Sequence, residues 1–206
     1  MADNEHLGIL WQGVEVWNRW REENPDIMPY LTGANLLHAE LIGADLAGAN
    51  LRDANLIAID LTDADLRWAD LSGARLVMAK LRGANLIGAD LTWANLIYAD
   101  MSGADLTDAN MSCAQLVETK IVDVILSNCK VYGISAWRLE GIPKGQSNLI
   151  ITRDDEPVIT VDNLEVAQFI YLLLHSPKIR DVIDTIARKA VLILGRFTDE
   201  RKTVLD

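Results

Sequence analysis

A five-residue period constrains this chain more than any other feature of its sequence. Over positions 31–116 every fifth residue is leucine, except Met101 and Met111. Two places before each of these residues, over positions 34–114, lies alanine, with Ile59 as the exception. A period of five matches neither the 3.6-residue turn of an α-helix nor the two-residue alternation of a strand. The chain must therefore turn a corner within each unit.

Each unit consists of alanine, aspartate or asparagine, leucine and two variable residues, as in residues 44–48 and 64–68. If a unit forms one side of a square, four units make a coil of 20 residues. Leucine at the centre of each side would then point inward, and only a residue as small as alanine fits near the corner at native packing density. Successive coils would stack about 4.8 Å apart, the spacing of hydrogen-bonded strands.

These units resemble the pentapeptide-repeat family over about residues 29–135. The resemblance implies an all-β solenoid, a right-handed quadrilateral β-helix of about five coils, but no particular activity. We expect an N-terminal helical cap over residues 1–28 and the β-helix over 29–135. A linker with a short strand over 136–157 and a small helical or α/β segment over 158–206 would follow.

A solenoid exposes its core and its strand edges at both ends, so both ends need caps. Residues 5–23 predict one amphipathic helix that ends before Pro25, because a proline disfavours the helical conformation in the residue before it. The apolar stripe of this helix consists of Leu7, Leu10, Trp11, Val14 and Trp17. We expect Trp11 and Trp17 to pack inside this N-terminal cap.

The C-terminal segment predicts a strand over 149–152 and two helices. Asp162 and Glu165 form a capping box for the first helix, and Ser176-Pro177 begins the second. Residues 190–194 predict a short apolar strand. This segment resembles the connector before a Toll/interleukin-receptor-like domain in some bacterial pentapeptide-repeat proteins. That resemblance implies the sensor or scaffold half of a signalling or defence protein, with a nucleotide-binding domain beyond residue 206. Alternatively, the helices complete the C-terminal cap.

Neither composition nor motifs indicate catalysis. Two cysteines make no disulfide framework, and the three histidines lie in separate segments without metal-ligand spacing. The sequence contains no phosphate loop or nucleophile elbow, so we expect no enzyme, cofactor or metal site. The formal charge of −11 disfavours nucleic acids and anionic membranes as direct partners. The polar, acidic N-terminus and the absence of an apolar run of about 18–20 residues favour the cytoplasm.

One outward column of the predicted coil is apolar throughout. Positions 20 apart should stack, and one such column consists of Leu37, Ile57, Val77, Ile97 and Val117. Met78 and Tyr98 lie beside it. A continuous apolar surface of this kind is typical of an interaction site. We therefore expect a scaffold whose apolar face binds a protein partner, a second copy of itself or its own C-terminal helices.

The opposite side is acidic. Its column carries Asp45, Asp65 and Asp105 with Asp108 nearby, and the adjoining side adds Asp70 and Asp90. Two interpretations remain open: these residues cap turn amides, as aspartate and asparagine commonly do, or they imitate DNA. Some members of the family mimic DNA and bind DNA gyrase, which makes gyrase an alternative partner. Among the other outward positions, Gly88 should accept a larger side chain at little cost.

Overall fold

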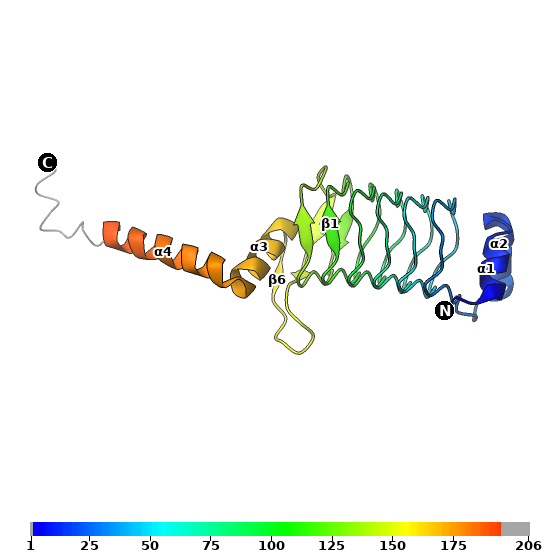
Figure 1. Ribbon diagram of the computed structural model, residues 1–206, viewed down its shortest axis with the longest axis horizontal. Coiled ribbons are helices and arrows are strands. Elements are labelled where there is room, and N and C mark those ends of the chain that lie inside the picture. The colour runs from blue at the N-terminus through cyan, green and yellow to red at the C-terminus, as the bar shows by residue number, and fades with distance from the viewer. Residues whose placement is uncertain (1, 195–206) are drawn as a thin grey trace, which may run out of the picture. The chain divides into compact units, whose positions relative to one another are not determined.

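The computed structural model describes the backbone of residues 2–194 and the side chains of residues 2–179 and 181–186. The chain divides into two compact units, Met1–Gln168 and Phe169–Asp206. The first unit contains helices α1 (Asn4–Leu10) and α2 (Val14–Glu23), a stack of coils, and the first residues of helix α3 (Leu164–His175). Figure 1 shows the coils following one another from α1 and α2 toward α3.

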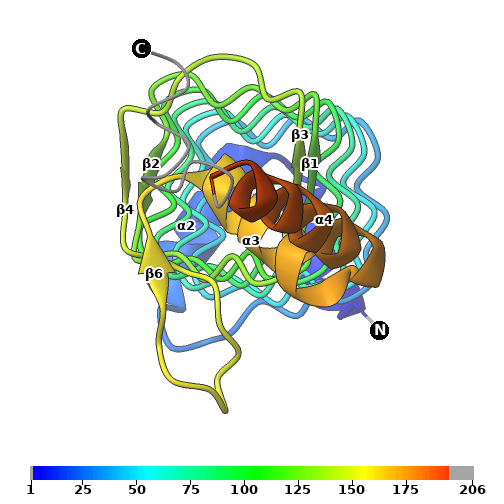
Figure 2. The ribbon, with the colours of Figure 1, turned by 90° about the vertical axis from the view of Figure 1, so that its left-hand side faces the viewer.

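The coils repeat every 20 residues. Parallel bridges join residues 20 apart, from Tyr30↔Asn50 to Lys130↔Ile150. Most repeats bridge through one residue only, because each side of the coil is short. In the later coils the bridges lengthen into strands: β1 (Gln115–Val117) pairs with β3 (Ser135–Trp137), and β2 (Ile125–Ser127) pairs with β4 (Gly145–Ser147). Figure 2 looks along the stack and shows its four-cornered outline, which confirms the predicted β-solenoid.

Most backbone N–H groups of a repeat have a hydrogen-bond acceptor, as residues 95–99 illustrate. The N–H groups of Asn95 and Leu96 bond to carbonyls of the coils on either side. The N–H of Ile97 donates to the side-chain oxygen of Asn95 (3.2 Å), and the N–H of Tyr98 donates to the following coil. The N–H of Ala99 closes the corner by bonding to the Leu96 carbonyl (3.0 Å). In most units that carry an aspartate or asparagine, this side chain thus completes the backbone hydrogen bonding of the corner.

The inward positions agree with the sequence prediction. The repeat leucines and alanines fill a single core that runs the length of the stack, and almost all of them are fully buried. Two polar residues replace alanine in this core and find acceptors there. The Thr119 hydroxyl donates to the Leu96 carbonyl (2.8 Å), and the Cys129 thiol donates to the Leu106 carbonyl (3.0 Å). Burial raises the pKa of Cys129 to about 12, so this thiol stays protonated at neutral pH.

The corner requires a positive φ at its second residue, the geometry of a type II turn. Glycine supplies it at several corners, including Gly88 with φ of 67°. The expectation that Gly88 would accept a larger side chain is wrong. A Cβ atom there would lie 2.2 Å from the Trp68 ring, which stacks over Gly88 from the neighbouring coil. Both the backbone conformation and the ring oppose any substitution.

The N-terminal cap consists of two helices rather than one. Gly13, with φ of 110°, separates α1 from α2, and α2 ends before Pro25 as predicted. This break turns Trp11 outward, where 58% of its surface is exposed, so the prediction that Trp11 packs in the cap is wrong. Trp17 is fully buried as expected.

Side chains of α2 bond to the backbone that the first coil leaves unpaired. The Trp17 indole N–H donates to the Asp45 carbonyl (2.7 Å). Asn18 donates to the Gly43 carbonyl (2.9 Å) and accepts the Asp45 N–H (2.8 Å). Arg21 donates to the Ala47 carbonyl (2.9 Å). The cap therefore takes the place of a missing coil, which is what an exposed sheet edge requires.

The coil ladder continues past residue 135, where the repeat pattern of the sequence fades. The bridges Lys120↔Glu140 and Lys130↔Ile150 and the strand pair β2–β4 extend it to Ile150, so most of the expected linker belongs to the stack. Strand β5 (Leu149–Ile150) then pairs antiparallel with β6 (Thr160–Val161). The predicted strand at 149–152 is confirmed in its first two residues.

The first turns of α3 close the C-terminal end of the stack. Gln168 is 5% exposed, and its side-chain oxygen accepts the Ala136 N–H (2.6 Å). The capping box assigned to Asp162 and Glu165 is wrong. Asn163 caps the helix by accepting the Val166 N–H (2.9 Å), whereas Asp162 accepts the Asn148 N–H (2.9 Å). Asp162 therefore joins the cap to the last coil instead of starting the helix.

The second unit contains the rest of α3 and helix α4 (Pro177–Leu194). The Ser176 hydroxyl accepts the Ile179 N–H (3.4 Å), which agrees with the predicted helix start. The predicted strand over 190–194 is wrong, because these residues belong to α4. The strand on which the resemblance to a Toll/interleukin-receptor connector depended is therefore absent from residues 190–194. Residues 195–206, the end of the segment predicted over 158–206, lie outside the described residues.

Candidate functional site

The apolar column predicted from the sequence runs along one edge of the stack. Each of its residues occupies the first corner position after a core leucine, and each faces outward. The pairing Val117↔Trp137 adds a sixth member that sequence reasoning missed, because Ala136 interrupts the leucine pattern there. We call this column the apolar strip. It consists of Leu37, Ile57, Val77, Ile97, Val117 and Trp137.

Backbone hydrogen bonds set the spacing of the strip. The carbonyls of Ile57, Val77 and Ile97 each accept an N–H from the preceding coil at 2.9–3.0 Å. Val117 and Trp137 continue the same series. Neighbouring members are therefore one strand spacing apart, and six of them extend over about 24 Å. The strip is rigid, because its members are held by the coil and not by a loop.

The strip projects bulky side chains into solvent. Leu37 and Trp137 at its ends are 43% and 51% exposed, and the four members between them are half-buried. Met78 and Tyr98 occupy the second corner position beside the strip, with φ of 57° and 60°, and both are more than half exposed. A left-handed conformation costs a residue other than glycine about 1–2 kcal/mol. The solenoid therefore carries large apolar groups here at positions where glycine would be easier to accommodate.

The two columns that flank the strip carry little net charge near its centre. On one side lies an amide-rich column in which Asn55 donates to the side-chain oxygen of Asn35 (2.7 Å). On the other side acids and bases largely alternate from coil to coil, and Lys80 pairs with Asp60 at 2.9 Å. This charged column consists of Glu40, Asp60, Lys80, Asp100, Lys120 and Glu140. An apolar centre with polar, compensated flanks is the usual composition of a protein interface.

The ion pair beside the strip lowers the pKa of its carboxylate. Burial alone would raise the pKa of Asp60, but hydrogen bonds from the Thr62 hydroxyl and from Lys80 outweigh it and hold that pKa below its ordinary value. The pKa of Asp100 is lowered in the same way, since the hydrogen bonds from Ser102 outweigh its desolvation. Both carboxylates are therefore charged at neutral pH, which keeps the charged column compensated.

The acidic residues identified in the sequence take part in building the corners. Asp70, Asp90 and Asp105 each accept the N–H of the residue two positions later, at 2.9–3.0 Å. Asp45 and Asp65 do the same at 3.0 and 3.1 Å. Asp108 differs, since it is itself a corner residue with φ of 61° and accepts a hydrogen bond from Asn128.

Arginines compensate part of this acidic surface. Arg67 binds both carboxylate oxygens of Asp65 through Nε, at 2.9 and 3.0 Å. Burial would raise the pKa of Asp65, but the hydrogen bonds from Arg67 outweigh it and lower that pKa. Arg21 lies 3.6 Å from Asp45, and Arg52 lies 3.8 Å from Asp70. The geometry thus supports the turn-capping interpretation of these aspartates.

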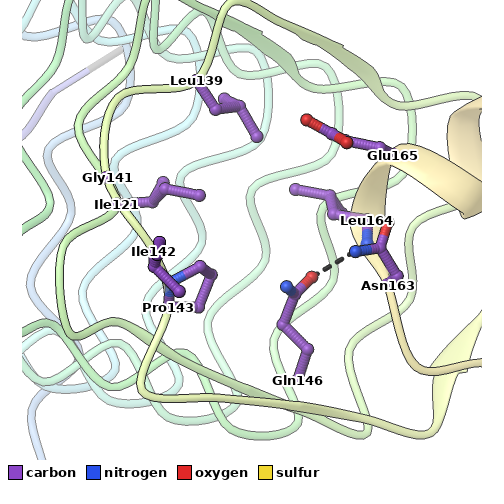
Figure 3. Close-up of a pocket in the computed structure, with 9 residues that line it drawn as sticks. All are labelled: Ile121, Leu139, Gly141, Ile142, Pro143, Gln146, Asn163, Leu164 and Glu165. Atoms are coloured by element: carbon purple, nitrogen blue, oxygen red, sulfur yellow. Dashed lines mark hydrogen bonds between the residues drawn. The ribbon is translucent and has the colours of Figure 1, made fainter.

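A small hollow lies between the last coil and the start of α3 (Figure 3). Its volume is about 180 Å³, and Gln146 crosses it to accept the Leu164 N–H at 2.8 Å. Six of its nine lining residues are apolar, and Glu165 is the one charged residue among them. The lining residues are Ile121, Leu139, Gly141, Ile142, Pro143, Gln146, Asn163, Leu164 and Glu165. No pair among them combines a nucleophile with a base.

A second hollow of about 370 Å³ lies between one side of the coils and the loop that joins β5 to β6. Its two cations already have partners in the loop or the coil. Lys130 pairs with Asp154 at 2.6 Å, and Arg153 lies 5.9 Å above the Tyr132 ring. Over the part of the chain that the structure describes, acids, cysteines and histidines form no cluster suited to a metal ion. None of the described helices is both long and apolar enough to cross a bilayer.

The family model for pentapeptide repeats matches eight copies in this chain, over residues 30–56, 49–88, 59–96 and 84–128. These ranges include every member of the apolar strip except Trp137. No curated protein sequence matches the chain.

Several solved structures are similar. A pentapeptide repeat protein from the thylakoid lumen of Arabidopsis thaliana is 33% identical, over 45% of this chain and 64% of that one, with a TM-score of 0.44. HetL, involved in the regulation of heterocyst differentiation in the cyanobacterium Nostoc sp. strain PCC 7120, is 31% identical over 62% of this chain and 63% of HetL, with a TM-score of 0.30. The chain therefore spans slightly less than two thirds of either protein.

A further pentapeptide repeat protein from Nostoc PCC 7120 is 33% identical over 48% of this chain and 84% of that one, with a TM-score of 0.28. The matched repeats coincide with the coils whose corners and core were described above. On the repeats and on this relative, the chain belongs to the pentapeptide-repeat family.

Proposed function

We propose that this protein is a non-catalytic interaction scaffold and that the apolar strip is its binding surface for another protein. The observation that carries the proposal is the confinement of the strip to one edge. The core leucines, the small inward residues and the corner aspartates or asparagines recur on all sides, because the coil needs them. The coil does not need six apolar side chains in one outward column.

The composition of the surface supports a protein as the partner. Protein interfaces are depleted in charge at their centre and enriched in aromatic residues and methionine. The strip and its adjoining corner column contain Trp137, Tyr98 and Met78, with Arg138 and Glu118 paired at 3.2 Å near one end. Burying a strip of a few hundred Å² would contribute several kcal/mol at about 25 cal/mol per Å², before the cost of association.

Site-specific photo-crosslinking tests this proposal, because it captures whichever protein lies against the labelled position. A photoreactive amino acid replaces Ile97 on the strip in one variant and Ile87 in the other. Ile87 is a matched control on the opposite edge: it is equally half-buried, and its N–H bonds to Asn85 at the same 3.2 Å. In cells that naturally contain the protein, we expect covalent protein adducts at position 97 and none at position 87. Equal adducts at both positions, or none at either, would overturn the proposal.

A second candidate is the gyrase-binding role that some members of the family have. The pairs Asp45↔Asp65 and Asp70↔Asp90 stack carboxylates one coil apart, which favours it. The arginines bound to several of these aspartates weaken the resemblance to DNA. A supercoiling assay separates the candidates: a gyrase-binding protein inhibits supercoiling at low salt, and Asp65→Lys with Asp90→Lys relieves the inhibition. Absence of inhibition by the wild type would remove this candidate.

A further inference from the structure

We infer that the apolar strip receives helix α4 of a second copy of this chain, so that two chains exchange their α4 helices. The inference rests on the proposed function, because it assigns the occupant of the same strip. Three properties of α4 support it: its exposed apolar face, its length and its charge.

The apolar face of α4 has the spacing of a docking helix. Ile179, Val182, Ile183 and Ile186 lie at i, i+3, i+4 and i+7, the positions through which amphipathic helices bind apolar surfaces. Val182 is 57% exposed and Ile186 is 62% exposed. Two large β-branched side chains on one helix face are therefore open to solvent within the second unit.

The dimensions of the helix and the strip agree. Helix α4 has 18 residues and is about 27 Å long, whereas the strip extends over about 24 Å. One helical turn advances about 5.4 Å and one coil about 4.8 Å, so each turn of the helix meets about one member of the strip. A helix of this length aligned with the solenoid axis would extend along the whole strip.

The charges of the two surfaces are complementary. The sequence of α4 contains four bases and two acids, although the whole chain has a net charge of −11. The charged column beside the strip contains four acids and two bases. The two acids in excess, Glu40 and Glu140, lie at the ends of this column, and a net positive helix beside it would supply the opposite charge there.

The surface area that each arrangement would bury distinguishes a dimer with exchanged helices from a dimer in which two strips contact each other directly. A strip of about 24 Å against a helix about 10 Å wide has a footprint of about 250 Å² on each partner. One strip against another would bury about 500 Å² in total, which lies within the range of crystal-packing contacts, most of which bury less than about 800 Å². Two helices exchanged between two chains would bury about 1,000 Å², the lower limit for a specific interface. The exchanged arrangement is therefore the one that a stable dimer requires.

Sedimentation velocity on the full-length chain tests the inference. We expect the wild type to sediment as a dimer, and Ile97→Lys on the strip and Val182→Glu on α4 each to give a monomer. The matched controls Ile87→Lys on the opposite edge and Thr185→Glu on the polar side of α4 should remain dimers. Circular dichroism verifies that all four variants are folded. A monomeric wild type would overturn the inference.

Cross-linking then identifies the chain that supplies the helix. Cys113→Ser and Cys129→Ala remove the native thiols, and alanine already fills the position of Cys129 in most repeats. One copy carries Val77→Cys and a differently tagged copy carries Val182→Cys. We expect a heterodimer after treatment with a short bifunctional reagent. Cross-links that form only when both cysteines are in the same chain would overturn the exchange.

The inference and the proposed function can fail separately. If Ile97→Lys abolishes the dimer but Val182→Glu does not, the strip is still an interface and α4 is not its occupant. If photo-crosslinking at position 97 captures other proteins and never this chain, the scaffold function stands and the inference is wrong. If position 97 gives no adduct at all, both fail.

Discussion

The acidic columns and the apolar strip occupy outward positions on the same coils, but only the acidic side chains take part in the hydrogen bonding of the coil. Asp70, Asp90 and Asp105 each accept a corner N–H that has no other acceptor in the repeat. The members of the strip take part in the hydrogen bonding of the coil through their backbone, and their apolar side chains supply no acceptor to it. In a repeat protein, an outward residue type that recurs on every side is explained by the structure of the coil. A residue type that is confined to a single edge requires another explanation.

This difference also explains how charge is distributed over the molecule. The acidity follows from a corner that needs an oxygen acceptor, which either aspartate or asparagine can supply. Asn85 and Asn95 make the same bond as the aspartates, at 3.2 Å. The carboxylate charge itself is therefore not needed for the fold. Substitutions in the core, at the corners and beside the strip test this division between structural columns and the strip.

The largest effect is expected in the core. Ala84 is fully buried, and Ala84→Leu should lower the free energy of unfolding by about 1–3 kcal/mol or more, because the coil has no space for the added atoms. The control is Ala58→Met beside the strip, where the next coil already carries Met78 at the equivalent position. Thermal unfolding followed by circular dichroism should show a clear decrease for Ala84→Leu only. Equal midpoints would mean that the inward and outward positions are misassigned.

The next effect concerns the corner glycines. Gly48→Ala and Gly88→Ala each place a residue at φ near 65°, which costs about 1–2 kcal/mol. Only Gly88→Ala also meets the Trp68 ring, since no atom lies within 4 Å of a Cβ at Gly48. Urea unfolding should therefore show the greater loss for Gly88→Ala, and Trp68→Ala should remove the difference. If the two alanine variants are equally stable, the ring does not restrict this corner.

A smaller effect is expected at the acidic columns. Asp90→Ala removes the acceptor of the Thr92 N–H and hydroxyl and should cost about 1 kcal/mol. Asp90→Asn keeps an oxygen at the same place and should be close to the wild type. Urea unfolding of the two variants measures the difference. If Asp90→Asn is as unstable as Asp90→Ala, the charge matters to the fold, which would contradict the interpretation of this column.

The smallest effect is electrostatic and lies beside the strip. The pKa of Asp60 is below its ordinary value of 3.8, so its contribution to stability is complete above that pH and is lost as the pH falls through the lowered pKa. Lys80→Met removes one of the groups that lower it and should raise the pKa of Asp60, so that the loss begins at higher pH. An NMR titration of the Asp60 carboxyl measures the change, with the exposed Lys144→Met as control. An unchanged titration would show that the pair does not compensate the flank.

Most of the fold could be predicted from the sequence because the pentapeptide unit is nearly self-contained. The hydrogen bond that closes its turn, the side chain that caps the turn and its two inward residues all lie in the same repeat. Its remaining backbone hydrogen bonds reach only the neighbouring coils. The 20-residue register therefore places Leu37, Ile57, Val77, Ile97 and Val117 in one column without reference to the tertiary structure. Trp137 was missed because the leucine that marks the register is replaced by alanine at position 136.

The ends of the stack could not be predicted in this way. The ladder continues to Ile150 because it is made of backbone groups, which pair whether or not leucine occupies the inward position. The break at Gly13 depends on contacts distant in sequence, since α2 must direct Trp17 and Arg21 at the first coil. The apolar run 190–194 suited a strand by composition but continues a helix begun at Pro177.

The coil, its register and the existence of one apolar edge follow from the amino-acid sequence alone. These properties follow from a local chemical unit repeated at a constant interval, and as a member of the pentapeptide-repeat family the chain forms a right-handed β-helix. The folded structure was needed to show that the aspartates cap corners, that Trp137 joins the strip and that α2 and α3 close the ends. Each of these depends on which backbone groups remain without a partner after the coils have stacked, and that is known only once the chain has folded.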